Sequence, residues 1–370
     1  MTAAEQAFMH CHGTGTARYY VTVTGGLEQV AWGEVQEKAP EAELERLERG
    51  RVFFRAPDDV QPLVKLRSVE NLHAYAGEVP AVTADRSSLE LIEQHVRGIS
   101  LDGCVALYEQ VAGPLSDPSF RVTATRRGTH DFNSQEVSAA AGAGVVGRYG
   151  WRVDLTGYDL EVTVDVREDT CLVGLRLSPE TMSRRSRVEH AHASLKSTVA
   201  YCMIRMLGAG VDDLFCDPMC GAGTVLVERA EYGAAGRLVG GDRDERMLGK
   251  ARVNLAAAGA EAALVQWDAR RLPLLKDTVD RVVCNLPWGR RVGSHRANLH
   301  IYPGFVRSLA AVLKPGGKAA LLTLEKRLLT RLIKRHTWLE LAETVPLSLG
   351  GLKPSIYLVT KSVGEGGDDH

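Results

Sequence analysis

The 370-residue sequence has no apolar run long enough to span a membrane. Its longest apolar stretches, such as residues 319–324, fall far short of the roughly 20 residues that a transmembrane helix needs. The first 17 residues also lack a basic segment followed by an apolar one, which is the pattern of a secretion signal. These absences predict a cytoplasmic protein with no membrane partner.

Cysteine pairs of the CxxC type are absent as well. The seven cysteines are odd in number and scattered, which argues against a disulfide framework and against a zinc knuckle. We therefore expect free thiols and no metal site. The composition is otherwise that of a globular protein, with 45% hydrophobic and 25% charged residues.

An excess of charge of one sign is also missing, because the formal net charge is -1 at pH 7. The total charge therefore gives no attraction to nucleic acid, and a face that binds it would have to be local. Basic clusters stand at residues 126–127, 184–187 and 326–335. Such clusters are more often solvated surface than binding sites.

The length predicts more than one domain, since single hydrophobic cores stop growing before this size. Residues 1–17 and 363–370 are Gly-rich or polar without an apolar period, and we predict that they are disordered. Residues 18–80 and residues 81–180 each mix helix and strand patterns, which indicates two compact α+β modules. Residues 181–210 are predicted to be a helical linker.

From residue 211 to residue 362 the pattern becomes a regular alternation of strand and helix. Strands that alternate with helices predict parallel crossovers and a doubly wound sheet. The predicted fold class is therefore α/β, with a Rossmann-like C-terminal domain preceded by two α+β modules. In such sheets ligands bind outside the carboxyl ends of the strands.

Three successive predicted strands end in residues suited to a nucleotide-like cofactor. The first is followed by DPMCGAGT, where Asp217 precedes a tight turn that contains Gly221 and Gly223 and opens a helix. Asp242 ends the second strand, at the position where an acid accepts hydrogen bonds from ribose hydroxyls. Asp268 follows the third and could accept a hydrogen bond from an adenine amino group.

A dinucleotide-dependent dehydrogenase is the nearest alternative for this turn. However, Leu226 stands where the GxGxxG pattern needs its third glycine, and Asp217 would repel a pyrophosphate. The same acid suits the cationic sulfonium and amino acid moiety of S-adenosylmethionine, which is the cofactor we predict. A plain strand-to-helix turn with capping aspartates is the other alternative, and the signal at three strand ends argues against it.

The fourth predicted strand ends in Asn285-Leu286-Pro287-Trp288, which we interpret as the catalytic segment. An exocyclic aromatic amine is a poor nucleophile, so acceptors must hold its hydrogens while its lone pair faces the methyl group. The side chain of Asn285 and the carbonyl of Leu286 can be these acceptors. Pro287 would stiffen the loop and Trp288 would stack on the base. The alternative is an ordinary turn with a core tryptophan.

Together, these motifs resemble class I amino-methyltransferases of the N2-methylguanosine tRNA type. Residues 120–150 and 153–166 resemble a THUMP domain, a tRNA-binding module that follows an N-terminal ferredoxin-like domain in such enzymes. The resemblance covers about residues 18–361. It implies transfer of a methyl group from S-adenosylmethionine to N2 of a guanosine in tRNA, in the acceptor stem at position 6 or nearby.

The resemblance also implies site residues and partners. Cofactor contacts are expected from Leu195, Asp217, Met219, Gly221, Gly223, Thr224, Asp242, Arg243, Asp268, Ala269 and Asn285. Contacts with the 3′ end and acceptor stem of tRNA are expected from Arg126, Arg127, His130, Phe132 and Arg291. Some eukaryotic members require a small activator subunit, which adds such a subunit as a possible partner.

The chain departs from the family pattern at one place. Many members read NPPY or NPPF where this chain has Leu286 and Trp288, so the shape of the base pocket is expected to differ. Two other functions stay open: guanosine-N2 methylation of ribosomal or other structured RNA, and a non-catalytic RNA-binding adaptor. The adaptor is disfavoured because Asn285, Pro287 and Trp288 are all present.

Overall fold

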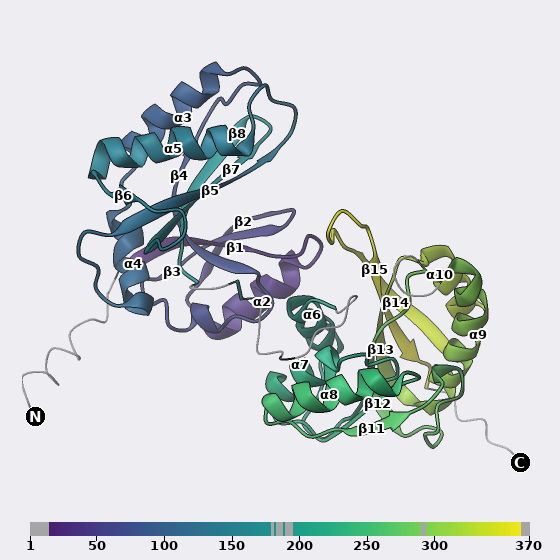
Figure 1. Ribbon diagram of the computed structural model, residues 1–370. Helices are drawn as coiled ribbons and strands as arrows, with labels where there is room; N and C mark the ends of the chain where they lie inside the picture. Colours follow the sequence, from purple (N-terminus) through teal and green to yellow (C-terminus); the bar gives the residue numbers. More distant parts are fainter. Residues whose placement is uncertain (1–14, 179–180, 183–187, 189–194, 290–293, 364–370) are drawn as a thin grey trace, which may run out of the picture. The chain divides into compact units, whose positions relative to one another are not determined.

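The computed structural model describes residues 15–178, 181–182, 188, 195–289 and 294–363, and the chain divides into two compact units (Figure 1). The first unit comprises Met1–Val23 and Trp32–Met182, and the second comprises Thr24–Ala31 and Ser183–His370. In the part of the chain that is described, none of the helices combines the length and the hydrophobicity needed to cross a membrane. The six described cysteines are buried, and no disulfide joins them within the described part of the chain.

The first unit is built on one eight-stranded sheet in the order β2-β3-β1-β4-β8-β7-β5-β6. Its strands are β1 (Thr16–Thr22), β2 (Glu43–Glu48), β3 (Arg51–Pro57), β4 (Asn71–Val79), β5 (Ser119–Arg127), β6 (Arg152–Val153), β7 (Leu160–Arg167) and β8 (Thr170–Arg176). Its helices are α3 (Ser87–Gly98), α4 (Asp102–Ala112) and α5 (Ser134–Tyr149), with the 3-10 turn η1 (Leu63–Lys65). Helix α2 (Glu28–Lys38) contributes residues to both units.

The two predicted α+β modules share this sheet. Strand β4 from residues 18–80 pairs antiparallel with β8 from residues 81–180. Gly174 permits the join, because a Cβ atom there would lie 2.7 Å from the ring of Tyr20 on β1. The boundary predicted at residue 80 therefore does not separate two sheets.

The second unit has a seven-stranded sheet in the order β11-β10-β9-β12-β13-β15-β14. Its strands are β9 (Leu214–Asp217), β10 (Arg237–Asp242), β11 (Ala263–Gln266), β12 (Val279–Asn285), β13 (Leu313–Thr323), β14 (Leu339–Pro346) and β15 (Ser355–Lys361). Its helices are α6 (Ser197–Leu207), α7 (Thr224–Tyr232), α8 (Glu245–Ala257), α9 (His295–Val312) and α10 (Lys326–Lys334), with the 3-10 turn η2 (Ala269–Arg271). Strands β9 to β13 pair in parallel, as predicted, whereas β15 runs antiparallel to both its neighbours.

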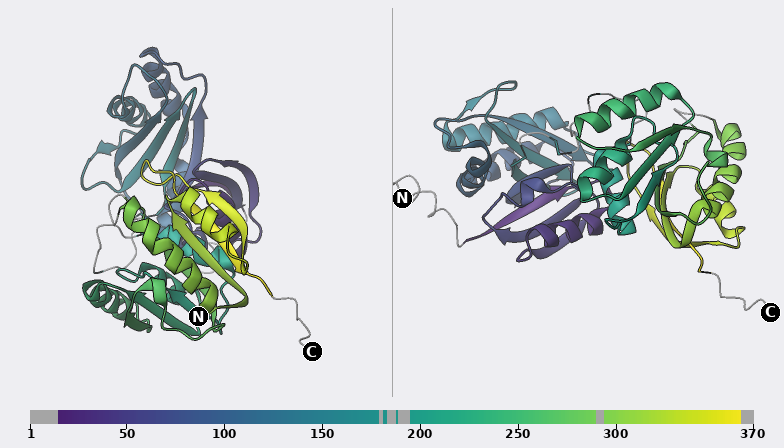
Figure 2. Two further views of the ribbon diagram at one scale, coloured as in Figure 1. Left: turned by 90° about the vertical axis from the view of Figure 1, so that its right-hand side faces the viewer. Right: turned by 90° about the horizontal axis from the view of Figure 1, so that it is seen from below.

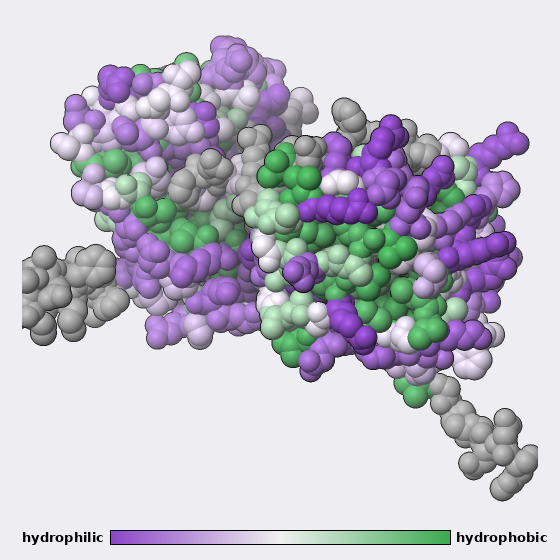
Figure 3. Space-filling model, turned by 60° about the horizontal axis from the view of Figure 1, so that its bottom comes forward, coloured by the Kyte–Doolittle hydropathy of each residue, from purple (hydrophilic) through white to green (hydrophobic). Residues whose placement is uncertain are grey.

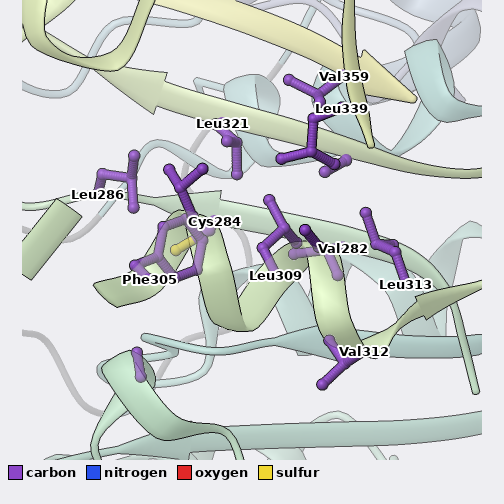
Figure 4. Packing of buried hydrophobic residues seen from close by; sticks show 14 of the residues in the cluster. Val282, Cys284, Leu286, Phe305, Leu309, Val312, Leu313, Leu321, Leu339 and Val359 are labelled. Carbon is purple, nitrogen blue, oxygen red and sulfur yellow. The ribbon is translucent and has the colours of Figure 1, made fainter. Parts of the chain in front are cut away.

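Helices cover both faces of this sheet (Figure 2), so the second unit is a three-layer α/β domain. On one face, α9 and α10 pack over β12 and β13, where Cys284 and Leu321 meet Phe305 and Leu309 (Figure 4). On the other face, residues of α6, α7 and α8 form a second apolar cluster. The predicted Rossmann-like fold class is confirmed by this architecture.

Within the predicted linker at residues 181–210, the helix α6 is part of the second unit and does not connect two domains. Nine of the eleven residues of α6 are buried, and six of the nine belong to the apolar cluster that also contains residues of α7 and α8. The segment Thr24–Ala31 joins the same unit through the fully buried Leu27 and a hydrogen bond from Ser348 N to Gly25 O of 2.8 Å. The second unit therefore contains sequence from well before residue 211.

The ends of the chain lie largely outside the described residues. Of the segment predicted to be disordered at residues 1–17, residues 1–14 are outside, but Thr16 and Ala17 already pair with β3. At the other end, residues 364–370 are outside the described part.

Candidate functional site

The glycine turn after β9 is shaped by two left-handed residues. Gly221 has φ +52° and Gly223 has φ +81°, a region that only glycine adopts at little cost. The amide of Gly221 donates to Oδ2 of Asp242 at 3.1 Å, so the turn is tied to the end of β10. Gly223 directly precedes α7, and Thr224 is the first residue of that helix. The turn therefore presents backbone groups at the carboxyl edge of the sheet, as predicted.

Asp217 is a buried carboxylate at the end of β9. Its side chain is 2% exposed, and Oδ1 accepts a hydrogen bond from the Met219 amide at 3.2 Å. Burial raises the pKa of Asp217 to about 8, opposed by that hydrogen bond and reinforced by the nearby Asp242 carboxylate. A buried acid of this kind gains most from a cationic ligand. The sulfonium and ammonium groups of S-adenosylmethionine fit this requirement.

Asp242 ends the neighbouring strand β10, which pairs with β9 so that Gly240 lies opposite Asp217. Besides the Gly221 amide, its carboxylate accepts the Asp244 amide at 3.0 Å. These two amides fix the side chain, and a carboxylate has further lone pairs for ribose hydroxyls. Asp242 therefore lies at the end of β10 with the lone pairs that the predicted acceptor of ribose hydrogen bonds needs.

Two supporting residues were missed by the sequence reasoning. Trp267 is buried and covers Gly241 so closely that a Cβ atom there would lie 2.1 Å from its ring. Its Nε1 donates to the Pro218 carbonyl at 3.0 Å, which links the end of β11 to the glycine turn. Asn254 on α8 is fully buried and donates to the Ala222 carbonyl at 2.9 Å. The consecutive glycines at 240 and 241 are the signal that could have indicated such close packing.

The third strand end is more open than the first two. Asp268 is exposed and accepts hydrogen bonds from the Arg270 side chain and amide, the side-chain contact lowering the pKa of the carboxyl. An ion pair at the surface contributes little, so this contact does not prevent Asp268 from meeting a ligand. Ala269 beside it is buried, whereas Arg243 on the neighbouring loop is exposed.

The predicted catalytic segment stands at the end of β12. The indole Nε1 of Trp288 donates to Oδ1 of Asn285 at 3.1 Å. Leu286 is 1% exposed, and its amide donates to the Leu322 carbonyl of β13 at 3.0 Å. The Pro287 carbonyl accepts hydrogen bonds from two side chains of α9, Asn298 and Tyr302. The segment is therefore a defined structure with acceptor groups at the edge that carries Asp217 and Asp242.

The remaining cofactor residues lie in the same unit. Leu195 is buried in the apolar cluster that contains α6, α7 and α8, and Thr224 is buried at the start of α7. Met219 is partly buried and packs against the cluster on the α9 face. The contacts of all these residues with a cofactor stay a prediction.

The predicted RNA-binding residues differ in their exposure. Arg127 is exposed, whereas Arg126 and His130 are partly buried and each contacts a backbone carbonyl: Arg126 donates to the Gly128 carbonyl at 2.8 Å, and His130 Nε2 lies 2.8 Å from the Glu168 carbonyl. Phe132 is only 2% exposed, so the structure does not support it as an RNA contact. It precedes Asn133, the capping residue of α5, where an apolar residue commonly packs into the core. Arg291 lies outside the described residues.

A groove at another edge of the second unit has no part in this site. It has a volume of about 840 Å³ and is lined by residues at the start of β9 and β10, including Leu214, Arg237 and Leu238, and by the end of α8. Apolar side chains of this unit also gather over a broad area of the face seen in Figure 3, interrupted by hydrophilic ones. Because ligands of parallel sheets bind at the carboxyl ends of the strands, the groove is on the wrong side for the cofactor.

Comparison with known families agrees with this architecture. The model of the RMKL-like methyltransferase domain matches residues 184–351, and the model of the THUMP domain matches residues 102–176. The tRNA (guanine(6)-N2)-methyltransferase of Thermus thermophilus is 36% identical over 245 residues, which are 66% of this chain and 72% of that protein. The crystal structure of TrmN from Thermus thermophilus has a TM-score of 0.77 and 29% identity, covering 94% of this chain and 100% of that one.

Longer relatives also occur. The Bos taurus protein named tRNA (guanine(6)-N(2))-methyltransferase THUMP3 is 29% identical over 344 residues, or 87% of this chain and 66% of that protein. The chain spans 51% to 66% of the length of the three mammalian relatives of this name. From the two family models, the Thermus relative and the strand-end site, the chain belongs to the THUMP-domain class I methyltransferase family.

Proposed function

We propose that this chain transfers a methyl group from S-adenosylmethionine to the exocyclic N2 of a guanosine in tRNA, with the guanosine at position 6 of the acceptor stem as the target. The observation that carries the proposal is the placement of Asp217, Asp242 and Asn285 at the carboxyl ends of three adjacent parallel strands. The names of the relatives from Thermus thermophilus and mammals support guanosine 6 as the target.

The residues of this chain divide the work. S-adenosylmethionine, when bound, supplies a methyl group on a positively charged sulfur. Asp217 meets the positive charge of the cofactor, and Asp242 accepts hydrogen bonds from its ribose. Asn285 Oδ1 and the Leu286 carbonyl hold the two amino hydrogens of the guanine, so that the nitrogen lone pair forms a bond to the methyl carbon as the bond from that carbon to sulfur breaks; one amino proton then passes to solvent. Neither a metal nor a covalent enzyme intermediate is needed for this displacement.

The first unit is proposed to hold the RNA. The THUMP match at residues 102–176 supports tRNA as the partner, and the exposed Arg127 is a candidate phosphate contact. We further propose that the 3′ end and acceptor stem are the parts recognised, and that the reaction takes place in the cytoplasm.

The test is methyl transfer from isotopically labelled S-adenosylmethionine to tRNA transcripts that carry either G6 or A6. The proposal expects N2-methylguanosine in the digest of the G6 transcript and loss of that product with A6. Methylation of ribosomal RNA or U6 snRNA in place of tRNA would favour the structured-RNA alternative; one relative is named a U6 snRNA (guanine-N(2))-methyltransferase. Failure to bind the cofactor in calorimetry would favour the adaptor.

A further inference from the structure

The carbonyl of Pro287 in the catalytic segment accepts two hydrogen bonds from one helix. Asn298 Nδ2 donates at 2.9 Å and the Tyr302 hydroxyl donates at 2.8 Å. The two residues are four positions apart on α9 and therefore lie on the same face of the helix. Both are fully buried, so solvent does not compete for these hydrogen bonds.

The Tyr302 hydroxyl is held in turn by the end of β13. Its oxygen lies 2.6 Å from Thr323 Oγ1, and Thr323 Oγ1 also accepts the Glu325 amide at 2.9 Å. Because the one hydroxyl proton of Tyr302 goes to Pro287, the Thr323 hydroxyl donates to Tyr302. The hydrogen bonds thus have a defined direction that runs from β13 through α9 to the loop after β12.

Asn298 has an unusual balance of hydrogen bonds. Its Nδ2 serves both the Pro287 carbonyl and Glu325 Oε1, the latter at 3.2 Å, whereas its Oδ1 is buried and meets no donor within the described chain. A buried acceptor without a partner is unfavourable, and an apolar residue of similar size would avoid this cost. The donor end of Asn298 is therefore the reason that an asparagine suits this position.

These hydrogen bonds fix the backbone of Pro287, the residue that directly follows the Leu286 carbonyl. The Pro287 ring restricts its φ, and holding its carbonyl fixes its ψ. The backbone before this carbonyl is fixed as well, because the Leu286 amide donates to the Leu322 carbonyl of β13 at 3.0 Å. The position of Trp288, whose indole donates to Asn285, also depends on the ψ of Pro287. Both proposed acceptors of the guanine amino group are therefore oriented through Pro287.

We propose that Tyr302 and Asn298 are positioning residues for methyl transfer, which aim the Leu286 carbonyl and the Asn285 side chain through the Pro287 carbonyl. This inference rests on the proposed function for its catalytic consequence. The alternative is that the two residues only stabilise the core. If the residues are positioning residues, removal of the Tyr302 hydroxyl changes the geometry of the loop. If they only stabilise the core, it changes only the stability of the fold.

Tyr302→Phe is the test variant, and Tyr357→Phe is its matched control. Both tyrosines are buried in the same apolar cluster, but the Tyr357 hydroxyl donates to the Lys326 carbonyl at 3.2 Å, away from the loop. In single-turnover methyl transfer with saturating enzyme and cofactor, Tyr302→Phe should be about 10- to 100-fold slower, because displaced catalytic groups lose rate steeply. Its cofactor Kd in calorimetry should stay within about twofold of wild type.

A second readout does not depend on activity. The five tryptophans give five indole N–H resonances, and the one that disappears in Trp288→Phe belongs to Trp288. This resonance should shift in Tyr302→Phe and in Asn298→Leu, and it should stay in place in Tyr357→Phe. Asn298→Leu keeps the branched shape and the number of side-chain heavy atoms and removes the donor, so it tests the inference independently if Tyr302→Phe folds poorly.

The outcomes separate the inference from the proposed function. If wild type does not methylate guanosine N2 but the Trp288 resonance moves as expected, the proposed function fails and the orientation of the loop stands. If wild type is active and both variants methylate at its rate, Tyr302 and Asn298 are not positioning residues. An equal loss of rate in Tyr357→Phe would also overturn the inference, because the effect would then come from stability.

Discussion

Raising the pH should strengthen cofactor binding through the ionisation of Asp217. This carboxyl is 2% exposed, and its burial raises its pKa to about 8. At pH 7 most free protein molecules therefore carry a neutral Asp217. The neutral acid does not attract the positively charged sulfonium and ammonium groups of the cofactor, whereas the carboxylate does. Binding should release a proton below pH 8.

The size of the effect follows from the pKa. If only the ionised form binds tightly, the apparent Kd is multiplied by one plus the ratio of neutral to ionised protein. With a pKa of about 8, this factor falls by about 30-fold between pH 6.5 and pH 9. The direction of the pH effect on the Kd follows from the same reasoning. The cation favours the ionised form of Asp217, so the Kd falls as the pH rises and ionises Asp217 in the free protein.

Calorimetric titrations of wild type and Asp217→Asn across this pH range provide the assay. The cofactor's own amino group titrates in the same range, but its effect is common to both proteins. The ratio of the variant Kd to the wild-type Kd should therefore rise by about 30-fold from pH 6.5 to pH 9. A ratio that does not change with pH would show that Asp217 does not face the positive charge of the cofactor.

Three further predictions concern the cofactor, the chemistry and the boundary of the second unit. Asp242→Ala should raise the Kd for S-adenosylmethionine by at least tenfold, since each charge-assisted hydrogen bond contributes roughly 1.5–3 kcal/mol. The control is Glu245→Ala, at an exposed acid on α8. An unchanged Kd in Asp242→Ala would show that Asp242 does not bind the cofactor. Asn285→Ala should lower the single-turnover rate on the order of 10²–10³-fold with little change in tRNA affinity, and a wild-type rate would make Asn285 a turn residue only. A fragment that begins at Val211 should unfold at a lower temperature than one that begins at Ser183, because it lacks α6 with its nine buried residues; equal midpoints in a thermal melt would contradict this.

The sequence predicted the strand ends of the second unit well, for a physical reason. Parallel strands buried on both faces appear as short apolar runs, and the residues that follow them must meet at one edge. The sequence alone therefore predicts that Asp217, Asp242 and Asn285 lie together. The antiparallel pair at the end of the sheet was harder, because β14 carries a register shift between Leu341 and Glu343 that breaks its alternation.

The RNA-binding residues were predicted less reliably because the same residue types serve two purposes. Phe132 was expected to contact tRNA because the resemblance to the THUMP family implied it. In the structure Asn133 and Glu136 form a capping box at the start of α5, and Phe132 stands at the preceding position. An apolar residue there commonly packs against the fourth residue of the helix, and Val137 at that position is also buried. The N-x-x-E spacing was present in the sequence and would have distinguished the two roles.

The residues that hold the catalytic segment gave no local signal at all. Tyr302 and Asn298 belong to a helix whose apolar face fills the core, so in the sequence they look like one more aromatic core residue and one polar exception. Their role depends on where the end of β12 passes the helix, which only the folded chain determines. The fully buried Asn298, with its amide nitrogen bonded and its amide oxygen unpaired, is the observation that favours orientation of the loop over simple packing. An unsatisfied buried polar atom beside a site is thus more informative than the identity of the residue that carries it.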